Sequence, residues 1–193
     1  AMLRDRWPEA GEKLVYLPLP AVTPAMAAVG EARRHAPPRA PDAPVQLLSI
    51  GRLAEQKDPE TMLRAVALLD GIDWRLTMLG DGPLRAAMET LAAELGMTTR
   101  VHFAGFVADP TAYLAKADLF LLSSRWEGLC AVAMEALASG CRIVATDCSP
   151  SLTDLLLAAG APAPVPLQDP AALAQAITKA IAQPAKIDGL IAA

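Results

Sequence analysis

The sequence predicts an α/β fold, a Rossmann-like domain with a mostly parallel sheet of about six strands. Two observations lead to this prediction. Short apolar runs of strand length alternate along the chain with segments of helix length, and three of the expected helices begin at an Asp-Pro pair. Strands that alternate with helices of about 10–15 residues imply parallel pairing with right-handed crossovers.

Six strands are expected: five short apolar runs and, near the end of the chain, one run that contains two prolines. They are residues 45–50 (VQLLSI), 74–79 (WRLTML), 100–103 (RVHF), 118–122 (DLFLL), 141–146 (CRIVAT) and 163–167 (APVPL). The helices are expected between these runs and after the last of them.

The helix starts are marked by capping residues. The Asp-Pro pairs at 58–59, 109–110 and 169–170 each offer a carboxylate to the free N–H groups of a first turn. Proline suits the first helical position because its missing N–H has no intrahelical partner there. Further helices are expected from Pro83 to Gly96, after Glu127-Gly128 as far as Gly140, and around Leu152–Ala159.

The first 44 residues differ from the rest. Residues 13–22 (KLVYLPLPAV) could form a strand, whereas residues 35–44 (HAPPRAPDAP) read as an extended loop or hinge. We therefore expect an N-terminal strand with a Pro-rich linker over residues 1–44 and one Rossmann-like domain over residues 45–193. A chain of 193 residues is long enough for one such domain with a substantial core.

Composition restricts the class of protein. No apolar run approaches the roughly 20 residues that span a bilayer, and no secretory signal is visible at the N-terminus. The net charge of −4 does not favour general attraction to nucleic acid. Cys130, Cys141 and Cys148 form no C-x2-C pair, so zinc is not expected, and their sparse, odd number fits a reducing cytoplasm.

Two glutamates suggest the ligand. Glu127 and Glu135 have seven residues between them, in a segment that leaves a strand, turns at Gly128 and becomes a helix. Parallel α/β sheets bind their ligands outside the carboxyl ends of the strands. Two carboxylate acceptors at fixed depth suit a polyhydroxylated ligand, such as a sugar nucleotide, better than a bare phosphate.

This spacing resembles the Glu-x7-Glu signature of the family-4 retaining glycosyltransferases of GT-B fold. Residues 51–58 (GRLAEQKD) resemble that family's phosphate loop, residues 79–83 (LGDGP) its Gly-x-Gly-Pro turn, and residues 101–107 (VHFAGFV) its next strand and loop. The motifs occur in family order over about residues 45–183. The resemblance implies the C-terminal, donor-binding half of a GT-B fold, with the N-terminal acceptor domain absent from this chain.

The resemblance assigns the cationic part of the site to the loop after the first strand. Gly51, Arg52 and Lys57 would surround the diphosphate, where a bidentate guanidinium and a mobile ammonium neutralise the leaving group. The alternative is a solvated loop with two ordinary surface cations. Gly80, Asp81 and Gly82 are expected to shape a tight turn rather than to touch the ligand.

The resemblance assigns Glu127 to the donor sugar and Glu135 to the ribose hydroxyls. The alternatives are a carboxylate that caps the following helix and a solvent-facing helical glutamate. Because Glu135 has apolar neighbours in sequence, it would need a partner. The N–H groups of Gly128, Leu129 and Cys130 can face the diphosphate.

Phe106 and Val107 would offer backbone contacts to the base, with core packing as the alternative, and His102 is expected to be structural. The chain departs from the family pattern at Leu129, at Cys130 and at residues 147–154. No Asp-x-Asp motif is present, so neither a metal nor another cofactor is expected; the nucleoside-diphosphate sugar is a substrate.

These inferences lead to one expected function and two alternatives. We expect the donor-nucleotide-sugar-binding half of a retaining, hexosyltransferase-type enzyme that is cytoplasmic, in its full-length form peripheral to the inner face of the membrane. Its expected partners are the sugar-nucleotide donor, the missing N-terminal domain and an unidentified acceptor, with no nucleic acid. One alternative is a nucleotide-sugar epimerase or phosphorylase of the same fold. The other is a non-catalytic sugar-nucleotide-binding module.

Overall fold

The computed structural model describes residues 21–36, 39–40 and 42–183. Residues 13–20 of the strand expected at 13–22 lie outside the described residues. Five parallel strands form one sheet in the order β3-β2-β1-β4-β5. They are β1 (Val45–Ile50), β2 (Trp74–Leu79), β3 (Val101–Gly105), β4 (Leu119–Leu122) and β5 (Arg142–Ala145). The α/β fold with a parallel sheet is confirmed.

The sixth strand, expected at residues 163–167, does not form, so that prediction was wrong. Only Val165 pairs with the sheet edge, through an isolated parallel bridge to Thr146. The Val165 N–H donates to Ala145 O, and its carbonyl accepts from Asp147 N. The neighbouring Pro164 and Pro166 have no N–H to donate, so the pairing cannot extend into a ladder.

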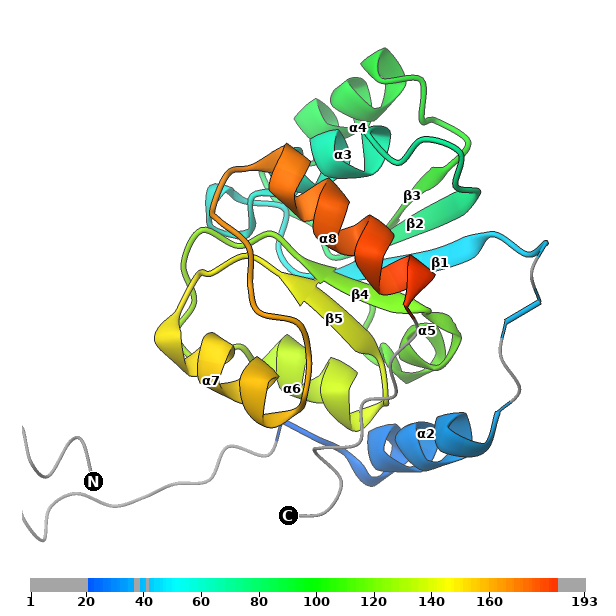
Figure 1. Ribbon diagram of the computed structural model, residues 1–193. Helices are drawn as coiled ribbons and strands as arrows, with labels where there is room; N and C mark the ends of the chain where they lie inside the picture. The colour runs from blue at the N-terminus through cyan, green and yellow to red at the C-terminus, as the bar shows by residue number, and fades with distance from the viewer. Residues whose placement is uncertain (1–20, 37–38, 41, 184–193) are drawn as a thin grey trace, which may run out of the picture.

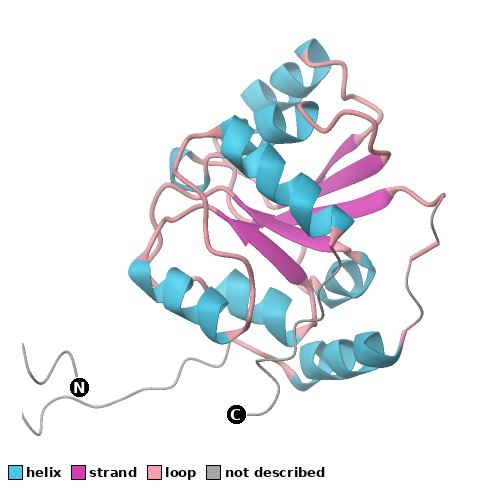
Figure 2. Ribbon diagram, in the orientation of Figure 1, coloured by secondary structure: helices cyan, strands magenta, loops and turns pink. Residues whose placement is uncertain are grey.

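Helices cover both faces of the sheet (Figure 2). They are α2 (Pro24–His35), α3 (Pro59–Ala67), α4 (Arg85–Glu94), α5 (Thr111–Lys116), α6 (Ala131–Ala138), α7 (Pro150–Ala158) and α8 (Pro170–Ala182), with a short 3₁₀ helix η2 (Glu55–Lys57). Two of the Asp-Pro caps form as expected: Asp58 accepts from Thr61 N and Asp169 accepts from Ala172 N. At the third pair, Pro110 itself is the N-cap of α5.

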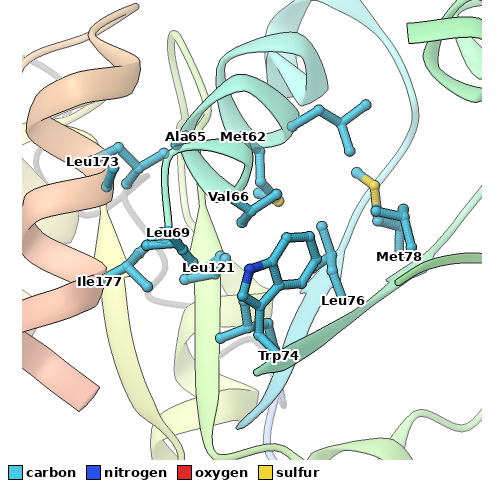
Figure 3. Packing of buried hydrophobic residues seen from close by; sticks show 14 of the residues in the cluster. Met62, Ala65, Val66, Leu69, Trp74, Leu76, Met78, Leu121, Leu173 and Ile177 are labelled. Atoms are coloured by element: carbon cyan, nitrogen blue, oxygen red, sulfur yellow. The ribbon is translucent and has the colours of Figure 1, made fainter. Parts of the chain in front are cut away.

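Two hydrophobic clusters fill the two sides of the sheet. The first lies under α3, α4 and α8, where the fully buried Trp74 packs among Met62, Leu76 and Leu121 (Figure 3). The second lies under α5, α6 and α7 and is centred on buried residues such as Phe120 and Ile143. Figure 1 shows α8 crossing one face while α6 and α7 lie on the other. A sheet buried on both faces explains why its strands are nearly continuous in apolar residues.

Helix α2 was not expected from the sequence. Thr23 caps its N-terminus, and Arg33 donates to the carbonyls of Leu114 and Ala117 at the end of α5, at 2.5 Å each. A Cβ placed on Gly140, just after α6, would lie 3.4 Å from Gly30 Cα, so α2 closely approaches the end of α6. This helix therefore packs on the sheet domain. The division of the chain at residue 44 stays a prediction.

Within the described residues, none of the helices has both the length and the apolar character that crossing a membrane requires.

Candidate functional site

The candidate site lies where the loops after β1 and β4 meet. These strands are neighbours in the sheet, with Leu47 opposite Leu119. The chain leaves β1 toward α3 on one face and leaves β4 toward α6 on the other. At such a point, where the strand order reverses, parallel sheets bind ligands in a crevice outside the carboxyl ends of the strands. Here a small crevice is lined by residues of both loops, among them Gly51, Lys57 and Ser123. Residues 51–58 and 123–130 form its two sides.

Lys57 and Glu127 meet across this crevice. The Lys57 Nζ lies 2.5 Å from Glu127 Oε1, although the two residues are 70 positions apart in the chain. The Glu127 side chain is only 6% exposed and that of Lys57 is 23% exposed. The sequence assigned these residues to different parts of one ligand, and the structure brings them into direct contact.

The buried Ser124 fixes the orientation of Glu127. Its hydroxyl donates to the same Oε1 atom at 2.7 Å. Within the described residues, Glu127 Oε2 accepts no hydrogen bond. A carboxylate with one oxygen held by two donors has the other oxygen available to accept a hydrogen bond from a ligand hydroxyl.

The backbone of Lys57 is held as well. The buried Ser123 hydroxyl donates to the carbonyls of both Lys57 and Asp58, at 2.9 and 2.8 Å. The aliphatic stem of Lys57 passes over Gly51, where an added Cβ would lie 3.3 Å from Lys57 Cδ. Gly51 therefore leaves space for the lysine that carries the charge.

Arg52 is exposed and makes no ion pair within the described residues. Its loop rests on the turn after β2. An added Cβ on Gly80, whose φ is +127°, would lie 2.0 Å from Gly51 O, and one on Gly82 would lie 2.4 Å from Leu53 O. Leu53 N also donates to Asp81 O at 3.0 Å. The turn at 80–82 thus shapes the loop of Arg52 by close backbone approach.

The loop from Gly128 to Cys130 leads into α6. Among the described residues, no acceptor receives the backbone N–H groups of Gly128, Leu129 or Cys130, and no side chain caps α6. Gly128 and Leu129 are exposed, whereas Cys130 is buried. These N–H groups together with the start of a helix favour an anion.

Glu135 lies in the second turn of α6 and is half-buried. Burial raises the pKa of its carboxyl group. The sequence suggested that this glutamate needs a partner, and no hydrogen bond or ion pair reaches its side chain from the described residues. A half-buried carboxylate without a protein partner can accept hydrogen bonds from ligand hydroxyls.

Phe106 and Val107 follow β3, the edge strand two places from β1. Phe106 is 81% exposed, and Val107 packs against the second hydrophobic cluster. The core-packing interpretation therefore fits Val107 but not Phe106. Neither residue is joined by a hydrogen bond to Lys57 or Glu127.

Three further residues at this site, Ser123, Ser124 and Arg125, were not predicted from the sequence. The Arg125 guanidinium lies 2.8 Å from a Glu55 carboxylate oxygen and 3.3 Å from one of Asp58. The distance to Asp58 is that of an ion pair, but the Arg125 Nε–H is not aligned to donate a hydrogen bond to this carboxylate. The available signal was the polar tripeptide Ser-Ser-Arg that directly follows β4, and it gives no sign of its partners.

Among the described residues, no group of three or more His, Cys, Asp or Glu side chains is placed to bind a metal ion. The three cysteines are buried free thiols.

Comparison with known proteins assigns the chain to a family. The family described as "Glycosyl transferases group 1" matches residues 31–191. The lipopolysaccharide core biosynthesis glycosyltransferase LpsE of Rhizobium meliloti is 43% identical over 105 residues, which cover 54% of this chain and 30% of LpsE. The GDP-mannose-dependent alpha-(1-6)-phosphatidylinositol dimannoside mannosyltransferase of Mycobacterium tuberculosis is 35% identical over 149 residues, covering 73% of this chain and 37% of that enzyme. The chain thus spans only about a third of the length of these curated relatives.

Solved structures share the fold. Sucrose-phosphate synthase from Thermosynechococcus elongatus matches with a TM-score of 0.70 and 25% identity, over 100% of this chain and 50% of that one. HepE of Anabaena, solved with UDP and glucose, matches with a TM-score of 0.69 and 19% identity, over 89% of this chain and 46% of that one. The second likeness shows the fold alone. With the parallel sheet and a family match over most of its residues, the chain is a GT-B domain that belongs to the glycosyl transferases group 1 family.

Proposed function

We propose that this chain is the donor-nucleotide-sugar-binding half of a retaining glycosyltransferase. The contact between Lys57 and Glu127 carries the proposal, because it brings a cation and a sugar-binding carboxylate together at the switch point of the sheet. Arg52 and the N–H groups of residues 128–130 would add to the positive potential for the diphosphate. The half-buried Glu135 would accept the ribose hydroxyls.

In this proposal the bond between the sugar C1 and the β-phosphate oxygen breaks while C1 forms a bond to the acceptor oxygen. The acceptor approaches on the face from which the diphosphate departs, and the acceptor proton passes to the leaving phosphate. Lys57 and Arg52 neutralise the charge that develops on that phosphate. No metal or organic cofactor takes part, and the donor is consumed as a substrate.

The rest of the active site would come from an N-terminal Rossmann-like domain of the same polypeptide. That domain would bind the acceptor and close the crevice against water. We accordingly expect the present chain to bind nucleotide weakly and to transfer no sugar by itself.

Calorimetry on the 193-residue chain tests the donor site. UDP, GDP and ADP are titrated in the presence of EDTA, and at least one is expected to bind. Lys57→Met should weaken that binding about tenfold or more, the scale of a lost charge-assisted hydrogen bond. Arg75→Met is the matched control, because Arg75 pairs with Asp73 beside the opposite end of β2. Binding that requires Mg²⁺, or that is unchanged in Lys57→Met, would contradict the proposal.

The reaction itself is tested in the full-length enzyme. Glycosyl transfer with an unchanged anomeric configuration at C1 is the expected outcome, measured by NMR of the product. An epimerised or phosphorolysed sugar would instead assign the site to the first alternative. Tight donor binding without any turnover would assign it to a binding module.

A further inference from the structure

Asp58 has a backbone conformation that few non-glycine residues adopt. Its φ is +44° and its ψ +57°, in the left-handed region, and its side chain is 2% exposed. One carboxylate oxygen accepts from the Thr61 hydroxyl at 2.8 Å and the other from Thr61 N at 3.4 Å. A buried carboxylate in a strained turn persists only where its surroundings hold it.

Arg125 supplies the charge that compensates Asp58. Its Nε lies 3.3 Å from Asp58 Oδ2, and a second guanidinium nitrogen lies 2.8 Å from Glu55. The pKa of Arg125 is raised, with Asp58 as the principal cause. One cation therefore contacts the residues on both sides of Gln56 and Lys57.

Backbone contacts join the same two segments. Arg125 N donates to Gln56 O at 2.8 Å, the Gln56 side chain donates to Trp126 O at 3.1 Å, and Ser123 holds the carbonyls of Lys57 and Asp58. Together these contacts tie η2 to the exit of β4. The next residues along that exit lead directly to Glu127.

We propose that Arg125 is a positioning residue, which acts through Asp58 and Glu55 to hold Lys57 at the phosphate side of the site. Lys57 lies between the two carboxylates that Arg125 binds, so the guanidinium restricts the backbone that carries the ammonium group. Arg125 does not itself contact the ligand. The inference rests on the proposed function, since it concerns the lysine to which that function assigns the diphosphate.

A double-mutant cycle separates positioning from general stability. Arg125→Met should weaken binding of the preferred nucleoside diphosphate on the order of tenfold, within the range of coupling measured for networked residues. In a Lys57→Met background the same substitution should cost less than about twofold, because the positioned group is gone. Equal losses in both backgrounds, or no loss in the first, would overturn the inference. Weak affinities are measured by ligand-observed NMR.

Two further variants keep the test decisive if Arg125→Met folds poorly. Arg125→Lys retains a cation near Asp58 and should recover part of the affinity. Asp58→Asn retains a helix cap and a residue that tolerates positive φ, yet loses the charge, so it should behave like Arg125→Met. Wild-type affinity in Asp58→Asn would contradict a role that acts through this carboxylate.

Hydrogen exchange on the free chain distinguishes failure of this inference from failure of the proposed function. Amides of residues 52–58 should exchange faster in Arg125→Met than in wild type, and Arg75→Met should leave them unchanged. If no nucleoside diphosphate binds the wild-type chain, the proposed function fails. In that case, unchanged amide exchange at residues 52–58 in Arg125→Met would also overturn the positioning role of Arg125, whereas faster exchange would support it.

Discussion

The Lys57 ammonium lies 2.5 Å from a carboxylate oxygen of Glu127, a residue 70 positions further along the chain. The group assigned to the diphosphate and the group assigned to the sugar are therefore partners in one ion pair. A phosphate that binds Lys57 must compete with Glu127, and a hydroxyl that binds Glu127 can use the oxygen that Ser124 and Lys57 leave free. This competition between the ligand and the Lys57–Glu127 ion pair has measurable consequences for affinity.

Glu127→Gln should leave the affinity for nucleoside diphosphate unchanged or raise it severalfold, because the carboxylate charge that competes with the phosphate for Lys57 is removed while the side-chain shape is kept. Affinity for the sugar nucleotide, or turnover in the full-length enzyme, should fall. Calorimetry with both ligands checks the pattern. Equal losses for both ligands would mean that Glu127 only supports the local fold and leaves the sugar to another residue.

Glu135→Gln should weaken nucleoside diphosphate and sugar nucleotide by similar factors, since both ligands carry the ribose. A lost charge-assisted hydrogen bond corresponds to about 1.5–3 kcal/mol, or about tenfold to over a hundredfold in affinity. The two ligands titrated into one variant provide their own control. A loss confined to the sugar nucleotide would place Glu135 at the sugar instead.

The same substitution should affect stability in a pH-dependent way. Burial raises the folded-state pKa of Glu135 above its unfolded value, so the favourable contribution of this group is fully present below the unfolded pKa and is lost as the pH rises through the folded pKa. Glu135→Gln should therefore increase the melting temperature relative to wild type at pH 7 more than at pH 4. Thermal melts of both proteins at the two pH values test this, and a reversed pH trend would disprove it.

The thiols should be unreactive in the folded chain. Burial, with a smaller effect of Glu127, raises the pKa of Cys130 to about 11, and burial raises that of Cys141 to about 11 and that of Cys148 to about 12. Since these pKa values lie well above 7.5, little thiolate, the reactive form, is present at that pH. A disulfide reagent should label the three cysteines slowly until denaturant is added. Rapid labelling of Cys130 in the native chain would contradict this environment.

The strands were predictable because their signal is local. Residues 45–50 and 74–79 form β1 and β2 at the expected bounds, and the next three differ by one or two residues at their ends. The strand predicted at 163–167 was wrong because the prediction followed the apolar residues of this run and gave too little weight to its two prolines, which cannot donate to a strand ladder. Helix α2 was missed although Thr23-Pro24 has the cap-and-proline pattern of a helix start. Its docking through Gly30 and Arg33 depends on distant backbone, which local sequence does not reveal.

The site was predictable only in part, for a related reason. Motif order located the two loops, and the structure brings Lys57 and Glu127 together. The roles toward a ligand stay predictions for all the assigned residues: Gly51, Arg52, Lys57, Phe106, Val107, Glu127, Gly128, Leu129, Cys130 and Glu135. The ties made by Ser123 and Arg125 join segments about 65 to 70 residues apart, so local sequence carries no sign of their partners.

The two sides of the crevice rest on different hydrophobic clusters. The loop with Lys57 runs into α3 over one face of the sheet, and the loop with Glu127 runs into α6 over the other. A ligand that spans both loops is thus a cross-link between two cores. Its binding free energy opposes the loosening of either face, so protection of slowly exchanging amides would rise on both sides of the sheet together.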